Sequence, residues 1–396
     1  MIEKIKSIKL DKKQVFDCLF LLYYGVVFTR FFLDTTMLPY ITWNIEVLYI
    51  IGITIGVLKL AVDRRMKVWE LIVFGLTITV AMLQYYHRPD EYVLAFAVLF
   101  IGAYNVDYRK LLKVYLVLGI SYTVFVVIGC LLGYIENLTF TLWNGNVRNS
   151  FGFNYPTDFT AHLFFFIVAW CILRYEKITW IEIGVFAAVM LWSYFGCYAR
   201  NNTICIGLVI VLCLMEKVFP AEKKCALREN KALKVVCIII PILIIGGMIF
   251  LSLIYNDGNA ILYKLDDILN HRLVSGKKGF IEYGLTPWGK QITMQGIGRI
   301  EGGIDSLYDS ELSYFMLDCS YVNILLQFGI IFFVILVLLL SIFLLKCCVK
   351  NKLFGVMILI IVCIQCAVEH HYLDIAYNPF LFFVFLGYRK NSGMEK

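Results

Sequence analysis

The sequence predicts an all-α polytopic membrane protein with about twelve transmembrane helices and one large external loop. Hydrophobic residues fill 61% of the 396 positions and charged residues only 16%, an apolar share that a soluble domain could not bury. The apolar residues also gather in runs of about 17 to 25. An α-helix of that length crosses roughly 30 Å of hydrocarbon with its own backbone hydrogen bonds satisfied.

Polar residues mark the boundaries of these runs. The fourth run is short and almost nothing polar separates the last two, so a count of ten or eleven spans stays open. The predicted spans are 15–33, 41–61, 68–86, 92–106, 111–134, 156–174, 180–197, 203–219, 235–255, 319–345, 353–370 and 372–388.

Basic residues support this topology. They precede the first span and recur in every second loop, which is typical of cytoplasmic segments. We therefore expect both termini in the cytoplasm. The chain divides into helices one to nine with short loops (1–255), a large extracytoplasmic loop (256–318), and helices ten to twelve with a cytoplasmic tail (319–396). The basic clusters are Lys4 to Lys13, Arg64 to Lys67, Arg109 to Lys113, Arg174 to Lys177, Lys217 to Lys231, Lys346 to Lys352 and Arg389 to Lys390.

The external loop is expected to contain short amphipathic helices that lie on the bilayer. Apolar residues recur at helical spacing from Ala260 to Leu273. Gly276 and Gly279 are expected to end this helix, a second helix to begin at Phe280, and "GLTPWG" at 284–289 to form a turn. The loop is basic up to Arg299 and acidic from Glu301 to Asp318, which suggests an anion site beside a hydrogen-bonding site.

Four segments carry a family resemblance through their order and spacing. They are "RNSFGFNYPTDFTAHLFF" at 148–165, "YARNNT" at 198–203, "NHRLVSGKKGFIEYGLTPWGKQI" at 270–292 and "DCSYVNILLQFGIIFF" at 318–333. With the predicted topology, they resemble the Wzy-type polysaccharide repeat-unit polymerases of the O-antigen polymerase and ligase superfamily. The resemblance covers nearly the whole chain and is strongest to the polymerases of Gram-positive capsule and exopolysaccharide clusters.

The resemblance implies a GT-C-like membrane glycosyltransferase at the outer face of the bacterial cytoplasmic membrane. It implies an undecaprenyl-diphosphate-linked oligosaccharide as donor and a second lipid-linked repeat unit as acceptor. Membrane lipid, a flippase and a chain-length regulator are the further partners it suggests. No cofactor and no nucleic acid are expected.

Arginine suits such a reaction, because its planar guanidinium binds phosphate oxygens in pairs and stays charged. External arginines also depart from the usual charge distribution. We predict that four of them bind the diphosphate, with contacts to lipid phosphates as the alternative for each; Arg88 is expected to be an interface anchor. The four are Arg148, Arg200, Arg272 and Arg299.

The catalytic candidates are Asp158, His162, His271 and Arg272. Asp158 and His162 are four residues apart and so share a helix face, where a carboxylate could hold an imidazole that accepts a proton. A purely structural role at the helix end is the alternative. His271 is a second candidate base, although it cannot share a helix face with its neighbour Arg272.

Further polar and aromatic residues are predicted to contact the glycan, with an interfacial aromatic belt or helix packing as the alternative. They are Asn154, Tyr155, Asp318, Tyr321 and Glu369. No Asp-x-Asp motif occurs, and "EHHYLD" at 369–374 is crowded for a metal site. We therefore expect no metal, with arginines in its place.

Two other functions stay open at this point. A lipid-linked oligosaccharide flippase would also need many spans and a basic cavity, although the chain has no visible internal repeat and few charges inside its spans. An O-antigen-ligase-like transferase would share the donor, the fold and the arginines. A membrane scaffold is a third alternative.

Overall fold

The computed structural model describes residues 12–38, 47, 50–55, 58, 68–88, 91–104, 106–142, 145–296 and 315–384. Over these residues the fold is all-α except for one small hairpin. Six of the described helices are long and apolar enough to cross a membrane, which makes the chain a multi-pass membrane protein. These segments are Gln14–Leu33, Tyr108–Leu131, Pro156–Arg174, Arg200–Val218, Lys231–Ile254 and Ser320–Val349.

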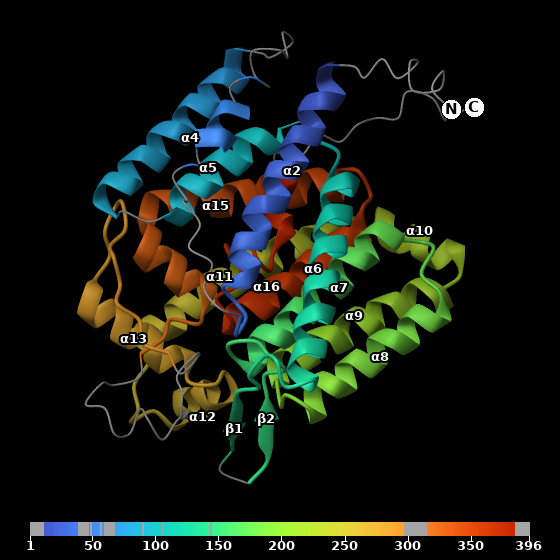
Figure 1. Cartoon of the computed structure of the whole chain (residues 1–396), viewed down its shortest axis with the longest axis vertical. Helices are drawn as coiled ribbons and strands as arrows, with labels where there is room; N and C mark the ends of the chain where they lie inside the picture. The colour runs from blue at the N-terminus through green and yellow to red at the C-terminus, as the bar shows by residue number, and fades with distance from the viewer. Residues whose placement is uncertain are drawn as a thin grey trace.

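The elements follow one another along the chain as Figure 1 shows. The N-terminal half contains α2 (Lys12–Leu33), α4 (Val68–His87), α5 (Glu91–Ala103), α6 (Tyr108–Leu131), strands β1 (Thr139–Thr141) and β2 (Val147–Asn149), α7 (Pro156–Arg174) and α8 (Trp180–Phe195). The C-terminal half contains α9 (Arg200–Val218), α10 (Ala221–Glu229), α11 (Lys231–Ile254), α12 (Ala260–Ile268), α13 (Arg272–Tyr283), α15 (Ser320–Val349), α16 (Leu353–Val368) and the 3-10 helix η1 (Pro379–Val384).

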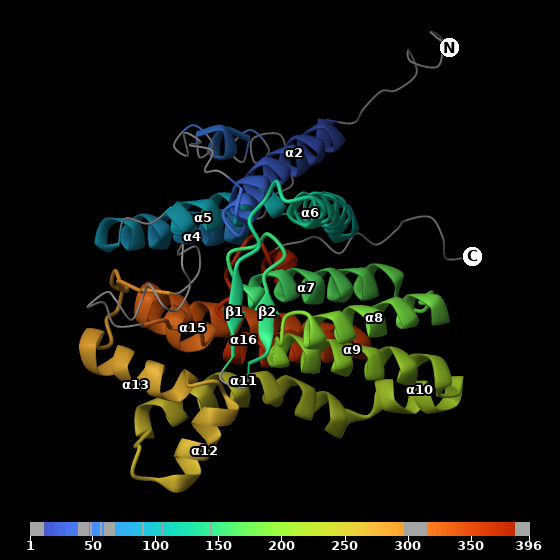
Figure 2. The same cartoon turned by 60° about the horizontal axis from the view of Figure 1, so that its bottom comes forward.

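The helices form layers around α16. Figure 2 shows α2, α4, α5 and α6 on one side, α7, α8, α9, α15 and α16 in the middle, and α11 beyond them. Helix α16 packs against α9, α11 and α15, and most of its residues are buried. Helix α8 instead leaves apolar side chains such as Ile181 and Phe195 exposed, as expected of a surface that faces lipid.

Ten of the twelve predicted spans coincide with described helices, but only six of the described helices are long and apolar enough to cross a membrane. A total of twelve transmembrane spans is therefore not shown. The segment 41–61 lies largely outside the described residues. The expected last span, 372–388, is wrong over its described part, which consists of turns and η1. Asp374 and Asn378 accept hydrogen bonds from the backbone N–H groups of Ala376 and Phe380, and such local bonds compete with a helix. The β1–β2 hairpin and α10 were not predicted.

The first helix of the predicted external loop also ends earlier than expected. Helix α12 stops at Ile268, and α13 begins at Arg272 and runs through both Gly276 and Gly279. These glycines do not break α13; they let it pack closely. A Cβ on Gly276 would lie 2.6 Å from Oγ of Ser252 in α11, and one on Gly279 would lie 2.9 Å from Leu326 in α15.

The turn at 284–289 is docked into a break in α15. Gly329 has a φ of 83° there, and a Cβ on it would lie 2.3 Å from the backbone nitrogen of Gly289. Carbonyls of the turn accept hydrogen bonds from Ile330 (3.0 Å) and Ile331 (3.2 Å). The turn thereby satisfies amides that the break removes from the helix, as a membrane protein requires.

The close contact at Gly276 makes a prediction about stability. Gly276→Ala is expected to destabilise the fold by about 1 to 3 kcal/mol, because α13 and α11 must move apart. Gly247→Ala is the matched control. Gly247 lies in α11 with nothing within 4 Å of an added Cβ, so this variant should stabilise the fold slightly through helix propensity alone. Thermal unfolding in detergent measures both. Equal stability of the two variants would contradict the close packing.

Candidate functional site

A polar cavity of about 880 Å³ lies where the β1–β2 hairpin meets the N-terminal ends of α7, α9 and α13. The segments 315–318 and 369–370 also contribute to its lining. Figure 1 shows the β1–β2 hairpin and α12 at the same end of the molecule, at the bottom of that view, with α13 next to α12. Eight predicted site residues, distant in sequence, line this cavity: Arg148, Tyr155, Asp158, Arg200, His271, Arg272, Asp318 and Glu369.

Asp266 sets the start of α13 at the cavity. Its carboxylate is only 1% exposed and accepts hydrogen bonds from the backbone N–H groups of Leu273 (2.7 Å) and Val274 (3.2 Å). These are unsatisfied groups in the first turn of a helix, where a negative charge is also favoured by the helix dipole. Nδ1 of His271 lies 3.2 Å from the same carboxylate. His271 is therefore oriented by Asp266.

Arg272 is the first residue of α13 and ties three segments together. Its Nε donates to the carbonyl of Val368 at the end of α16 (2.8 Å), and one NH group donates to the carbonyl of Asn270 (3.1 Å). The same nitrogen lies 2.6 Å from Oδ2 of Asp318. Arg272, which was predicted to bind the diphosphate, thus pairs with Asp318, which was predicted to contact the glycan.

Arg148 and Arg200 reach the cavity from two different elements, β2 and α9. Arg148, on β2, donates to the carbonyl of Cys197 (3.0 Å) and to the hydroxyl of Tyr155 (3.1 Å), and its guanidinium lies over the Tyr155 ring. Arg200 begins α9 and donates to the side-chain oxygen of Asn270 (3.0 Å). The cavity therefore has guanidinium groups from β2, α9 and α13.

Glu369 and His370 place an acid and a cation side by side. The Glu369 side chain is 5% exposed, and burial raises the pKa of its carboxyl to about 7 despite the opposing charge of Arg272. Burial alone would lower the pKa of His370, but its ion pair with Asp318, at 3.6 Å, outweighs this and the pKa rises to about 9. His370 is thus cationic at neutral pH, while the Glu369 carboxyl group is partly protonated at that pH.

Three predicted residues lie away from the cavity lining. His162 is fully buried: its Nε2 lies 2.9 Å from the hydroxyl of Thr35, and its ring stacks on Tyr377 at 4.1 Å. Its Nδ1 has no hydrogen-bond partner, so the expected Asp158–His162 pair is wrong. His162 lies one helical turn deeper than Asp158, inside the aromatic core.

Asn154 and Tyr321 make contacts within the helix bundle. The Asn154 amide donates to the carbonyl of Asp34, and the Tyr321 hydroxyl donates to the carbonyl of Cys363 (2.6 Å). Both side chains therefore hold neighbouring segments together. Arg299 lies outside the described residues.

Several cavity residues were absent from the predicted site. Asn201 and Tyr198 lie beside Arg200, Lys278 is one of two adjacent lysines in the segment 270–292, and His370 belongs to "EHHYLD". The available signal was the clustering of polar residues in these segments. Lys277 donates to the carbonyl of Leu253, whereas its neighbour Lys278 lines the cavity, and sequence alone could not separate them.

His370, His371 and Asp374 form a group that could be considered for a metal. Their ligand atoms lie within 4.8 Å of one another. Two nitrogen ligands of one zinc ion, each about 2.1 Å from it, can be no more than about 4.2 Å apart. His370 pairs with Asp318, and the ring of the buried His371 stacks on Tyr377 at 3.9 Å. This arrangement is looser than a zinc site.

No protein-family model, curated protein or solved structure matches the chain.

The cap on α13 yields a prediction. Asp266→Ala is expected to lower the free energy of unfolding by about 1 to 3 kcal/mol, since two helix N–H groups lose their acceptor. Asp267→Ala removes the same charge from an exposed neighbour and serves as the control. Thermal unfolding compares the two. Similar values would show that Asp266 does not organise α13.

The raised pKa of Glu369 predicts a pH-dependent effect on stability. Folding favours its protonated form, so between its ordinary pKa of 4.5 and about 7 the fold loses stability as pH rises. Glu369→Gln should therefore raise the melting temperature at about pH 8 and change it little at about pH 5. The exposed Glu229→Gln on α10 is the control, for which no such pH dependence is expected. A Glu369→Gln effect independent of pH would contradict the assignment.

Proposed function

We propose that the protein polymerises undecaprenyl-diphosphate-linked oligosaccharide repeat units into a surface polysaccharide, at the outer face of a bacterial cytoplasmic membrane. One observation carries the proposal. In a chain built mostly of apolar helices, arginines from β2, α9 and α13 share a large polar cavity with Lys278, His370 and buried carboxyl groups. Such a cavity suits a large, anionic and hydroxyl-rich substrate.

In the proposed reaction, a hydroxyl of the acceptor repeat unit attacks the anomeric carbon of the donor glycan. The bond between that carbon and the diphosphate oxygen breaks, and undecaprenyl diphosphate leaves with the bonding electrons. The acceptor loses its hydroxyl proton to a base. The reaction therefore needs cations at the diphosphate and a carboxylate or imidazole near the acceptor.

Arg148, Arg200 and Arg272 supply the positive charge for the diphosphate, with no metal required. Arg200 is the most direct ligand, because its described hydrogen bond is to a neutral amide, whereas Arg272 already pairs with Asp318. Arg272 also acts by fixing α13. Lys278 adds a further cation at the cavity.

Glu369 is one candidate base, because its buried carboxyl group lines the cavity. A pKa of about 7 lets a carboxyl group accept a proton near neutral pH and still release it. Asp158 and His271 line the same cavity and stay alternative bases. Tyr155 and Asp318 line the same cavity, and in this proposal their polar atoms contact the glycan.

Reconstitution in liposomes tests the proposal. Purified protein supplied with the lipid-linked repeat unit should give a ladder of polymers. Arg200→Ala should slow ladder formation about 100- to 1000-fold, and Arg200→Lys should retain part of the activity, because it keeps the charge but loses the paired donors.

Arg109→Ala is the matched control: it removes one arginine from the start of α6, away from the cavity lining. Full activity of folded Arg200→Ala would contradict the proposed diphosphate site. Transbilayer movement of the substrate without ladders would favour the flippase. Transfer of a single glycan to a different acceptor would favour the ligase.

Removal of divalent cations provides a further prediction. Ladder formation in excess EDTA should match that in magnesium or manganese, because side chains of the protein neutralise the diphosphate in the proposed reaction. The assay compares initial rates in the two buffers with the same liposomes. A rate that falls in EDTA and returns on addition of one metal would contradict this part of the proposal.

A further inference from the structure

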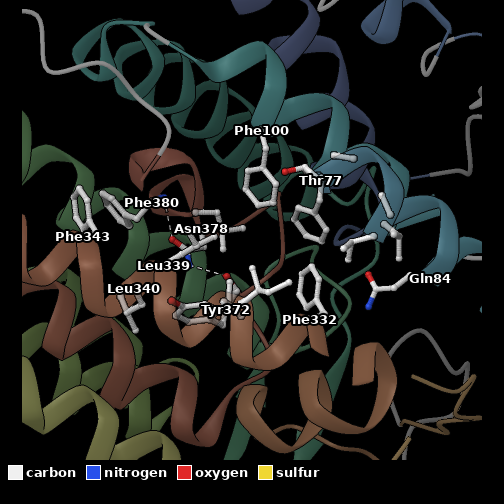
Figure 3. Close-up of a pocket in the computed structure, with 18 of the residues that line it drawn as sticks. Thr77, Gln84, Phe100, Phe332, Leu339, Leu340, Phe343, Tyr372, Asn378 and Phe380 are labelled. Atoms are coloured by element: carbon white, nitrogen blue, oxygen red, sulfur yellow. Dashed lines mark hydrogen bonds between the residues drawn. The ribbon is translucent and has the colours of Figure 1, made fainter. Parts of the chain in front are cut away.

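A second cavity lies between the helical layers and is almost entirely apolar. It has a volume of about 290 Å³ and is lined by α4, α5, α15, α16 and the segment 372–381. Figure 3 shows Phe100, Phe332, Phe343 and Phe380 around this space, with Leu339 and Leu340 of α15 beside them. The lining is thus made of ring faces and aliphatic chains.

The side-chain amides of two polar lining residues, Asn378 and Gln84, donate hydrogen bonds to backbone carbonyls around the cavity. The Asn378 amide donates to the carbonyl of Tyr372 (2.8 Å), and its oxygen accepts from the N–H of Phe380 (3.0 Å). The Gln84 amide donates to the carbonyl of Phe328. A charged or strongly hydrated ligand would lose its hydration here with little compensation, so the cavity selects hydrocarbon.

The exposure of the lining residues shows where the cavity opens. Leu76 of α4 is 59% exposed and Ile335 of α15 is 39% exposed, whereas Phe96 and Val362 are each 2% exposed. The cavity therefore runs from the lateral surface of the helices to the interior. In a multi-pass membrane protein that surface faces lipid, so the entering ligand is a hydrocarbon chain from the bilayer.

One segment forms a wall of both cavities. Glu369 and His370 line the polar cavity, and Tyr372 and Asn378 line the apolar one. The segment is held rigidly: Oγ of Ser320 donates to the carbonyl of Glu369 (2.6 Å) and accepts from the N–H of Tyr372 (3.1 Å). A molecule with an anionic head and a long apolar chain would fit this pair of adjacent sites.

We propose that the apolar cavity between α4–α5 and α15–α16 binds the polyprenyl chain of the lipid-linked substrate. This inference rests on the proposed function for the identity of the lipid. The aromatic faces of Phe96, Phe100, Phe332 and Phe380 suit the methyl-branched, unsaturated units of a polyprenyl chain. Holding the chain beside the 369–378 segment fixes the position of the diphosphate relative to the acceptor.

Photo-crosslinking tests the proposal in the intact protein. The protein is placed in nanodiscs with a polyprenyl phosphate that carries a diazirine on its chain, and labelled peptides are located by mass spectrometry. A parallel sample carries a phospholipid with a diazirine on its acyl chain. We expect the polyprenyl probe to label the lining of α5, α15 or η1, excess unlabelled undecaprenyl phosphate to suppress this labelling, and the phospholipid probe to label it weakly.

Two variants fill the cavity from different helices. Ala97→Leu and Ala81→Leu each add a side chain at a buried lining position and should reduce labelling about fivefold or more, because they displace part of the chain. Ala188→Leu makes the same change at an exposed site on α8 and should have no effect. Thermal unfolding identifies any variant that fails to fold. Competition by unlabelled undecaprenyl phosphate in the wild-type protein tests the cavity assignment without the variants.

Labelling confined to other surfaces, labelling that undecaprenyl phosphate does not suppress, or equal labelling by the phospholipid would overturn the inference. The proposed function has a separate outcome. Specific labelling in a protein that makes no polymer would contradict the function but not the cavity assignment. Polymer formation without labelling of the cavity would contradict the cavity assignment alone.

Discussion

The ion pair between Arg272 and Asp318 is the contact on which the polar cavity depends. The two side chains are 14% and 11% exposed, and Arg272 also bonds to the end of α16. Loss of one partner from such a buried pair costs about 3 to 5 kcal/mol, since the other charge is left uncompensated. The pair therefore joins α13, α15 and α16 at the point where the cavity forms. It makes Arg272 as much an organiser of the site as a ligand.

Much of the fold could be predicted because hydrophobic length and charge act locally. The bounds of α7, Pro156–Arg174, agree with the predicted span, since Pro156 begins the helix and Arg174 ends it. The glycines of α13 show the limit of such reasoning. Gly276 and Gly279 were expected to stop a helix, but their purpose is close contact with Ser252 and Leu326, which are distant in sequence. Propensity cannot indicate such a partner.

The candidate site was also predictable only where the signal lay in the local sequence. The predicted external position of Arg148 and Arg200 departs from the usual distribution of basic residues and drew attention to them, and both line the polar cavity. Their binding of a diphosphate stays a prediction. The spacing of Asp158 and His162 gave a wrong pair, since a shared helix face does not determine how deep each side chain lies. Asp266 had no signal at all: its role depends on the left-handed conformations of Asn270 and His271, which turn the chain back toward it.

The central claim is that the polar cavity binds a lipid-linked diphosphate, and a cryo-EM structure of the protein with undecaprenyl diphosphate in nanodiscs tests it most directly. The account predicts density for the diphosphate within hydrogen-bonding distance of Arg200, in the cavity bounded by α9, α13 and Glu369. Diphosphate density at mid-membrane depth between the helical layers, with this cavity free of it, would contradict the account.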